Sequence, residues 1–354
     1  MNSTSQIHQT LRDSAGIRWM VLLFLAFAMF CSYIFMDILS PIKDLMQSTR
    51  GWDSTAFGTM QGSETFLNVF VFFLIFAGII LDKMGVRFTA VLSGAVMLVG
   101  AVINWYAVTE SFQGSGLETW FNNNLNYIPG FDELGISPFY EGMPASAKFA
   151  AVGFMIFGCG VEMAGITVSR GIVKWFKGRE MALAMGSEMA LARLGVATCM
   201  IFSPMFAKLG GVIDVSRSVA FGVVLLMIAL IMFIVYFFMD KKLDAQTGEA
   251  EEKDDPFKIS DLGSILSSSG FWLVALLCVL YYSAIFPFQK YAVNMLQCNL
   301  VFTEVPADSF WATNTVTVIQ YLIMLVVAAA AFASNFSKRA SMKNGLLVVA
   351  GVAL

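Results

Sequence analysis

The chain has 354 residues, of which 58% are hydrophobic and only 13% are charged, and its formal net charge is −3. Its mean hydropathy is +0.73, and a soluble domain carries about 25% charged residues, so this chain has too little polar surface for a water-soluble globule. These values exclude a cytosolic enzyme and a disordered scaffold. They also exclude a nucleic-acid-binding protein, because the sequence has no basic excess.

Cysteine and histidine usage narrows the chemistry further. The five cysteines are scattered without a C-x-x-C pair, and the single histidine, His8, lies in the polar N-terminal tail. Thiols in apolar runs pack as small hydrophobic groups, and the apolar segments offer no histidine as a metal ligand or proton relay. The sequence also lacks a G-x-x-x-x-G-K-[ST] motif for nucleoside triphosphates. We therefore expect no metal, no cofactor and no catalytic site.

Apolar stretches long enough to cross a bilayer recur along the whole chain. A spanning helix needs about 20 predominantly apolar residues. A ninth stretch begins near Asn344 and is still apolar at Leu354, so we expect the chain to be a fragment. Eight complete stretches are predicted, at residues 18–39, 63–81, 88–108, 148–173, 180–208, 217–239, 271–296 and 309–334.

The N-terminal tail, residues 1–17, is polar and shows no signal-peptidase pattern, so the first span is expected to be retained. Lys and Arg gather at one set of span ends, which places the N-terminus inside and loops 109–147 and 297–308 outside. Loop 109–147 carries no N-x-[ST] sequon. We expect a multi-pass protein of the cell's inner (plasma) membrane, with the lysosomal membrane as the less favoured alternative.

Asp37 lies near the outer end of the first span, four residues after Tyr33. An ionisable side chain within an apolar span is costly unless it is paired or faces water. Asp37 is therefore expected either to line the mouth of an aqueous cavity or to cap the end of its helix.

A motif with the pattern G-x-x-x-D-[RK]-x-G-x-[RK] follows the second span, at Gly78, Asp82, Lys83, Gly85 and Arg87. Its glycines suit a close helix approach at Gly78 and a tight turn at Gly85. Asp82 precedes the third span, where it can hold partner charges and the free backbone N–H groups of a helix start. Lys83 and Arg87 are expected to anchor the turn at the inner surface.

Two opposite charges lie at similar depth in the fourth and fifth spans. Glu162 precedes Trp175 by thirteen residues, and Arg193 follows Glu180 by thirteen residues. At a rise of about 1.5 Å per residue, each lies about 20 Å from the inner surface. Such charges either pair with each other or face one aqueous cavity. The residues alone leave three roles open: binding of a zwitterionic ligand, a structural ion pair, or proton coupling through Glu162.

Residues 240–268 form a charged stretch that divides the chain. We predict a cytoplasmic tail at 1–17, an N-terminal bundle of six helices at 18–239, a cytoplasmic linker at 240–268 and the incomplete start of a second bundle at 269–354. In the second bundle, Tyr281 and Tyr282 precede Pro287, which can kink the helix. These tyrosines are predicted to bind ligand or, alternatively, to pack as aromatic rings.

The motif at Gly78–Arg87 resembles the signature of the major facilitator superfamily. The segments Trp175–Glu180 and Ala192–Gly195, with Glu162 upstream, are similar to the branch of major facilitator superfamily domain-containing protein 1, whose members transport dipeptides. The resemblance implies two six-helix bundles, an all-α membrane fold and a latch role for the loop motif. It also implies that Glu162 and Arg193 bind the amino and carboxyl termini of a dipeptide, with a bidentate contact from the arginine.

The sequence thus predicts a facilitative or secondary-active transporter of a dipeptide or similar zwitterion that works by alternating access. Asp37, Glu162, Arg193, Tyr281 and Tyr282 are the predicted substrate-binding residues. An organic-anion exchanger of the same superfamily and a non-transporting membrane receptor are the alternatives. The expected partners are a small solute, a proton in a coupled variant, and the lipid bilayer, with a monomer as the working unit and no nucleic acid.

Overall fold

The structure is a computed structural model that describes residues 10–247, 259–299, 322–323 and 326. The chain divides into two compact units, Met1–Met295 and Leu296–Leu354. The following description concerns the first unit and helix α10, which crosses the boundary. The predicted loop 297–308 and the eighth and ninth spans lie almost wholly outside the described residues.

Long apolar helices make up most of the described chain, as the sequence predicts. Six described segments are long and apolar enough to cross a membrane: Ala15–Arg50, Phe73–Val108, Ala145–Phe176, Met181–Gly211, Val215–Thr247 and Ser269–Ala292. Their principal helices are α1 (Ala15–Met36), α4 (Phe73–Val108), α6 (Ala145–Phe176), α7 (Met181–Ala207), α8 (Val215–Thr247) and α10 (Ser269–Asn299). The all-α membrane fold is thereby confirmed.

The second and third predicted spans are divided differently from the sequence expectation. Helix α3 (Ser54–Phe70) starts earlier than predicted and ends before Phe72, whose φ of 56° is left-handed. Helix α4 then runs from Phe73 through the predicted turn to Val108, with one non-helical residue at Gly85 (φ 79°, ψ 165°). Because glycine has no Cβ, it accepts this conformation without steric cost. The predicted turn is therefore a break at one glycine.

Short helices cover the ends of the bundle. Those beside the predicted outer loops are η2 (Ser40–Ile42), α2 (Lys43–Arg50), η3 (Glu110–Phe112), α5 (Gly116–Asn124) and η4 (Leu209–Gly211). Those near the charged inner segments are η1 (Leu11–Asp13) and α9 (Ile259–Leu266). Loop 109–147 folds onto the bundle, because Phe121 and Phe139 are buried and Lys148 Nζ donates to Asn126 Oδ1 at 2.8 Å.

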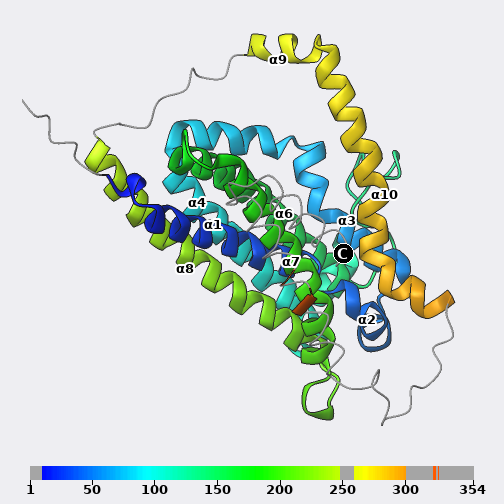
Figure 1. Cartoon of the computed structure of the whole chain (residues 1–354). Coiled ribbons are helices and arrows are strands. Elements are labelled where there is room, and N and C mark those ends of the chain that lie inside the picture. Colours follow the sequence, from blue (N-terminus) through cyan, green and yellow to red (C-terminus); the bar gives the residue numbers. More distant parts are fainter. Residues whose placement is uncertain (1–9, 248–258, 300–321, 324–325, 327–354) are drawn as a thin grey trace, which may run out of the picture. The chain divides into compact units, whose positions relative to one another are not determined.

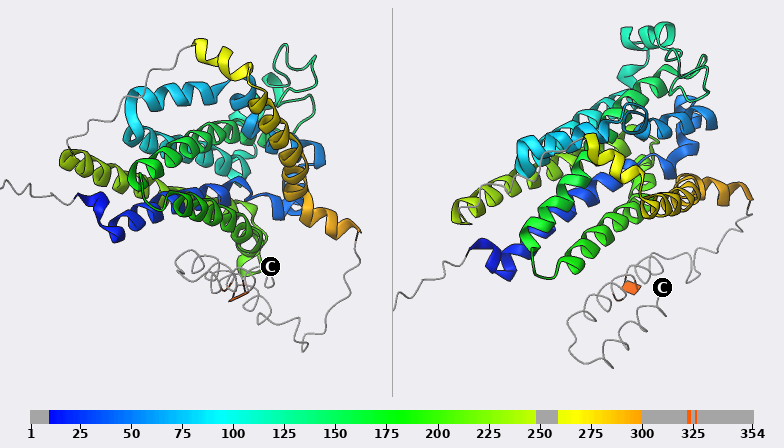
Figure 2. Two further views of the ribbon diagram at one scale, coloured as in Figure 1. Left: turned by 45° about the horizontal axis from the view of Figure 1, so that its top comes forward. Right: turned by 90° about the horizontal axis from the view of Figure 1, so that it is seen from above.

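The helices of the first unit pack in a layered bundle (Figures 1 and 2). Helix α4 contacts α6 and α8, α1 contacts α7 and α8, and α3 contacts α6. The backbones of α4 and α6 approach closely, since a Cβ built on Gly100 would lie 2.4 Å from the Phe157 nitrogen. Small residues permit such contacts between membrane helices.

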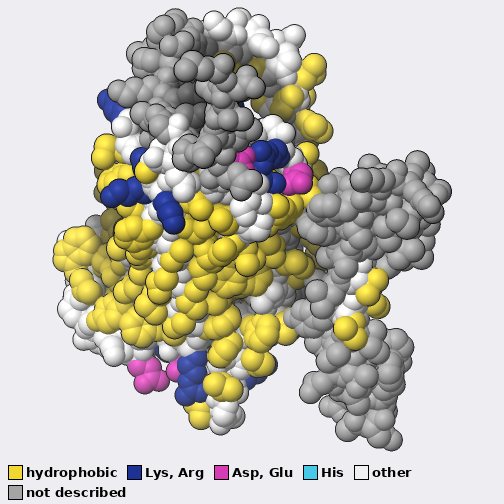
Figure 3. Space-filling view, turned by 60° about the vertical axis from the view of Figure 1, so that its left-hand side comes forward, with side chains coloured by type: hydrophobic (Ala, Val, Ile, Leu, Met, Phe, Trp, Pro, Cys, Tyr) yellow, Lys and Arg dark blue, Asp and Glu magenta, His cyan; other side chains and the backbone are white. Residues whose placement is uncertain are grey.

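The outside of the bundle is apolar over a wide area. Figure 3 shows hydrophobic side chains covering the middle of one face, with Lys and Arg gathered at its ends. On α8, for example, Ile231 and Phe238 are 56% and 62% exposed. An exposed surface of this composition is stable against lipid, and helices satisfy their backbone hydrogen bonds internally there. Helix α8 itself continues to Thr247, beyond residue 240 where the sequence places the linker.

Candidate functional site

Tyr33 on α1 lies near three of the predicted binding residues, Glu162, Arg193 and Tyr282. The guanidinium carbon of Arg193, on α7, is 5.4 Å from the centroid of the Tyr33 ring. This is cation–π distance. Glu162 on α6, Glu188 on α7 and Tyr282 on α10 lie within electrostatic range of the Tyr33 hydroxyl. Arg193 therefore contacts Tyr33, and the other three side chains lie in its wider surroundings.

Glu162 and Arg193 are both near Tyr33 but do not neutralise each other. In the described part of the chain, the ion pairs of α6 involve Arg170 and Lys174, and none joins Glu162 to Arg193. Arg193 is exposed and Glu162 is half-buried. Each charged group therefore remains open to a ligand group of opposite charge.

Glu188 adds a second carboxyl group to the same environment. It lies on α7, five residues before Arg193, and only 5% of it is exposed. With Glu162, it gives the surroundings of Tyr33 two carboxyl groups and one guanidinium. Such a balance favours a ligand that carries an amino group and does not favour a purely anionic one.

The two predicted tyrosines of α10 differ in their surroundings. The Tyr282 ring stacks on the Phe286 ring at 5.0 Å and 13° and meets the Tyr281 ring edge-on at 5.3 Å. Tyr281 is 58% exposed and is not among the groups that act on Tyr33. The structure therefore brings Tyr282 to the Tyr33 group and leaves Tyr281 at an aromatic cluster.

Asp37 belongs to a different contact. It is the C-cap residue of α1, and its carboxylate pairs with Lys290 Nζ of α10 at 2.7 Å and accepts a hydrogen bond from Gln289 Nε2 at 3.2 Å. Asp37 is 2% exposed. The sequence predicts either a cavity-lining role or a helix cap. Asp37 takes the C-cap position of α1 through its backbone, and its side chain contacts Lys290 and Gln289 of α10.

The loop motif is held by two neighbouring helices. Asp82 forms an ion pair with Arg170 of α6, which the sequence does not pair with any residue. The guanidinium of Arg87, which the sequence predicts to anchor the turn at the inner surface, reaches Asp240 and Asp244 on α8, at 3.8 and 3.3 Å. At Gly78 no described atom comes within 4 Å of an added Cβ, so the expected close approach is not seen there. Lys83 is exposed.

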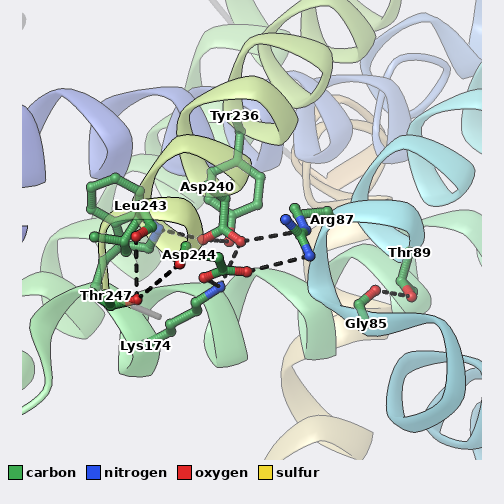
Figure 4. A network of polar contacts seen from close by, with 10 residues as sticks. Gly85, Arg87, Thr89, Lys174, Tyr236, Asp240, Leu243, Asp244 and Thr247 are labelled. Carbon is green, nitrogen blue, oxygen red and sulfur yellow. Dashed lines mark hydrogen bonds and ion pairs between the residues drawn. The ribbon is translucent and has the colours of Figure 1, made fainter. Parts of the chain in front are cut away.

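A buried charge network surrounds Asp240 (Figure 4). Lys174 Nζ is 2.6 Å from Asp240 and 2.7 Å from Asp244, and Trp175 Nε1 donates to Asp240 Oδ1 at 2.8 Å. The hydroxyl of Tyr236 lies 3.4 Å from the same oxygen. This network joins the motif helix α4, the end of α6 and the end of α8. It gives the inner end of the bundle a fixed geometry.

Three functionally suggestive residues were missed by the sequence reasoning: Glu64, Lys290 and Asp240. Glu64 is 7% exposed on α3 and had a usable signal, since it opens a predicted apolar span. Lys290 lies in the seventh predicted span, where the sequence gives it no partner. Asp240 was read as the start of a solvated linker, because a charge at a span end is usually exposed.

Comparisons with known proteins match most of the chain. The family model described as Major Facilitator Superfamily matches residues 25–354. The lysosomal dipeptide transporter MFSD1 of Danio rerio is 25% identical over 282 residues, which cover 77% of this chain and 52% of the relative. Its counterparts from Bos taurus and Homo sapiens are 24% and 22% identical over 315 residues, 86% of this chain and 58% of each relative. The chain thus spans little more than half the length of these curated relatives.

Proposed function

Since this chain belongs to the Major Facilitator Superfamily, we propose that it transports a dipeptide or similar zwitterion across a membrane by alternating access. Glu162 binds the ammonium group of the solute, and Arg193 binds its carboxylate. Tyr33 and Tyr282 line the space between these two charges. The observation that carries the proposal is the convergence of Glu162 and Arg193 on Tyr33 without an ion pair between them.

The unpaired charges favour ligand binding over the other two roles. A structural ion pair requires contact, and the described ion pairs of α6 end on Asp82, Asp240 and Asp244 instead. An organic-anion exchanger is disfavoured because Glu162 and Glu188 both repel an anion near Arg193. A receptor without transport would retain costly intramembrane charges with no polar solute to satisfy them. The names of the relatives, which describe dipeptide transporters, point to the same class of solute.

The inner charge contacts supply the gating part of the proposal. Asp82–Arg170 fixes the motif to α6, and Arg87–Asp244 fixes it to α8. Because these contacts connect helices within one bundle, they keep the motif in place while the second bundle moves relative to it. In this proposal the motif latches the bundles in one state of the transport cycle.

We further propose that the transporter works as a monomer in the plasma membrane, the location favoured by the sequence. The relatives' names give the lysosome as their location, which is the alternative. Fractionation of cells expressing a tagged chain distinguishes the two membranes, and light scattering of the purified protein gives the oligomeric state. Enrichment with lysosomal markers or a stable dimer would overturn the corresponding part.

A thermal-shift screen of the purified protein with dipeptides, free amino acids and dicarboxylates tests the function. We expect dipeptides to raise the unfolding temperature and dicarboxylates to leave it unchanged. Because a ligand that binds only the folded state stabilises it in proportion to the logarithm of its concentration, the shift must grow with dipeptide concentration. A response to dicarboxylates alone would favour the anion exchanger.

A further inference from the structure

The two charges of the proposed solute site lie on two different close-packed helix pairs. Glu162 is on α6, whose backbone meets that of α4 at Gly100. Arg193 is on α7, which packs equally closely against α1, because a Cβ on Gly195 would lie 2.5 Å from the Phe30 carbonyl oxygen. The distance between the two charges therefore depends on how the α4–α6 pair is placed against the α1–α7 pair.

The turn between α6 and α7 joins the two pairs. Its backbone is left-handed at Gly178, with a φ of 73°, and again at Glu180, with a φ of 36°. Glycine adopts this conformation readily, whereas in a glutamate it is strained and persists only where surrounding contacts hold it. Glu180 is the N-cap residue of α7. Its conformation therefore sets the direction in which α7 leaves the turn.

A buried arginine holds this turn against the start of the chain. Arg18, in the first turn of α1, is 4% exposed, and its Nη2 pairs with the Glu180 carboxylate at 3.4 Å. Its Nη1 donates to the carbonyl oxygens of Arg12 and Asp13 at 2.8 and 3.2 Å. The guanidinium carbon is also 5.9 Å from the centroid of the Phe176 ring, at the end of α6. One guanidinium thus joins η1, α1 and both sides of the turn.

Two further contacts extend this junction. Arg179 Nη2 lies 2.7 Å from Asp13 Oδ1, although both side chains are partly exposed and such a pair contributes little alone. The backbone N–H of Leu11 donates to Gln246 Oε1 of α8 at 2.9 Å. Figure 1 shows this start of the described chain, in blue, beside the end of α8. Because α8 is bound to α4 and α6 through the Asp240 network, the N-terminal segment contacts both parts of the bundle.

We propose that residues 10–18, here called the N-terminal clasp, hold the α6–α7 turn in its left-handed form and thereby set the distance between Glu162 and Arg193. Arg18 is then a positioning residue, which acts on the solute site through the turn and not by touching the solute. This inference rests on the proposed function, since it concerns the same site.

A fixed distance between the two charges selects solutes by length. The amino and carboxyl termini of a tripeptide are separated by one residue more than those of a dipeptide, which adds up to about 3.5 Å in an extended chain. A site held at the dipeptide distance rejects the longer solute. A site whose turn is loose adapts to both, so loss of the clasp is expected to weaken the preference for the dipeptide.

Peptide binding to the purified protein tests the inference, with alanyl-alanine and trialanine as the probes in calorimetric titrations. We expect the wild type to bind the dipeptide at least tenfold more tightly. Arg18→Lys, whose ammonium lacks the planar fork of donors, is expected to reduce this preference below threefold. Lys241→Gln removes an exposed charge near the same end of α8 and is expected to keep the preference.

Two variants of Glu180 separate the backbone conformation from the ion pair. Glu180→Gln and Glu180→Asn both remove the carboxylate, but asparagine adopts a left-handed backbone more readily than glutamine. We expect the glutamine variant to lose the dipeptide preference and the asparagine variant to stay within twofold of the wild type. Equal losses in the two variants would overturn the proposal. If Arg18→Lys does not fold, this pair of variants decides.

Hydrogen exchange gives a readout that needs no solute. In the turn, the backbone N–H of Arg179 donates to the Phe176 carbonyl at 2.9 Å, and that of Ala184 donates to the Glu180 carbonyl at 3.0 Å. We expect the protection of these two amides to fall at least fivefold in Arg18→Lys and to remain in Lys241→Gln.

The two measurements distinguish the clasp from the proposed function. A wild type that binds neither peptide would overturn the proposed function and, with it, the length selectivity. Unchanged amide protection in Arg18→Lys, or an unchanged preference for the dipeptide in that variant, would overturn the clasp alone.

Discussion

Asp82 of the loop motif and Arg170 of α6 form an ion pair across two neighbouring helices. The sequence places Asp82 at a turn and gives Arg170 no partner. The contact fixes the turn at the inner end of α6, the helix that also carries Glu162. A change at the motif can therefore affect the transport cycle without touching the solute.

Asp82→Asn is expected to slow transport more than it weakens solute binding. The amide removes the charge that Arg170 pairs with, so the motif is held less firmly while the Tyr33 group keeps its geometry. We expect turnover to fall about tenfold, with the apparent affinity changed less than twofold. Initial rates of dipeptide uptake over a concentration series measure both. Arg170→Gln is the matched change of the other partner and must give the same pattern. A loss of affinity at normal turnover contradicts the latch role.

Arg193→Ala is expected to abolish uptake of solutes that carry a free carboxylate. The guanidinium supplies a planar pair of donors that a lysine ammonium cannot copy, so Arg193→Lys should recover only part of the affinity. We expect a loss of at least tenfold in affinity for the alanine variant, measured by binding to the purified protein. Arg217→Ala, near the start of α8, serves as the control. Undiminished binding by Arg193→Ala would remove this residue from the site.

Glu162→Gln is expected to discriminate between solutes by their amino terminus. The carboxylate attracts an ammonium group, whereas an acetylated amine carries no charge for it to bind. Affinity for a dipeptide with a free amino group should fall about tenfold, and affinity for the N-acetylated form should change little. Competition against labelled dipeptide gives both values. Equal losses for the two solutes indicate a structural role for Glu162 instead.

Gly158→Ala is expected to destabilise the fold by about 1–3 kcal/mol through overpacking. The new Cβ would lie 2.0 Å from the Glu64 carbonyl oxygen, so α3 and α6 must separate. Gly165→Ala is the control on the same helix, because no described atom lies within 4 Å of a Cβ there. Thermal unfolding in detergent compares the two. A Gly158→Ala protein as stable as the wild type shows that the helices tolerate separation.

The N-terminal segment is expected to loosen as the pH falls. Hydrogen bonds from the backbone and hydroxyl of Thr10, together with the Arg179 ion pair, hold the pKa of Asp13 below its usual range. A pKa lowered by folding contributes stability above the unfolded value, and this contribution is lost as the pH drops through the folded value. The protection factors of the amides in residues 10–18, which correct for the slower intrinsic exchange in acid, should therefore fall as the pH drops. In Asp13→Asn the protection factors should be low already at neutral pH and should not depend on this titration.

The apolar spans and the intramembrane charges were predictable because both follow from the cost of polarity in lipid. Glu162 and Arg193 stood out as isolated charges in long apolar runs. The helix break at Phe72 and the merging of two spans into α4 were not predictable, since hydropathy does not register a single left-handed residue. Nor was the pairing of Arg87 with Asp240 and Asp244. Partners so far apart in sequence are chosen by tertiary packing, which composition cannot reveal.

Lys290 illustrates the same limit at the contact between α1 and α10. Its charge is visible in the sequence, but its partner Asp37 is about 250 residues away in the chain. The seventh span could be predicted to exist, whereas the face it presents to the first span could not. Glu64 could have been identified as a buried charge by the same argument as Glu162. It was not, because it lies at the margin of the predicted span 63–81, where a charged residue is usually exposed.

The glycine contacts between α4 and α6 limit which parts of the protein can deform. A Cβ on Gly153 would be 2.7 Å from the Gly100 carbonyl oxygen, and one on Gly160 would be 2.6 Å from the Met97 nitrogen, so the two backbones mesh over several turns. Sliding or tilting within this pair would force main-chain atoms into each other. We therefore expect α4 and α6 to move together as one rigid unit. Bending of the backbone during transport is expected at the helix breaks, Phe72 and Gly85.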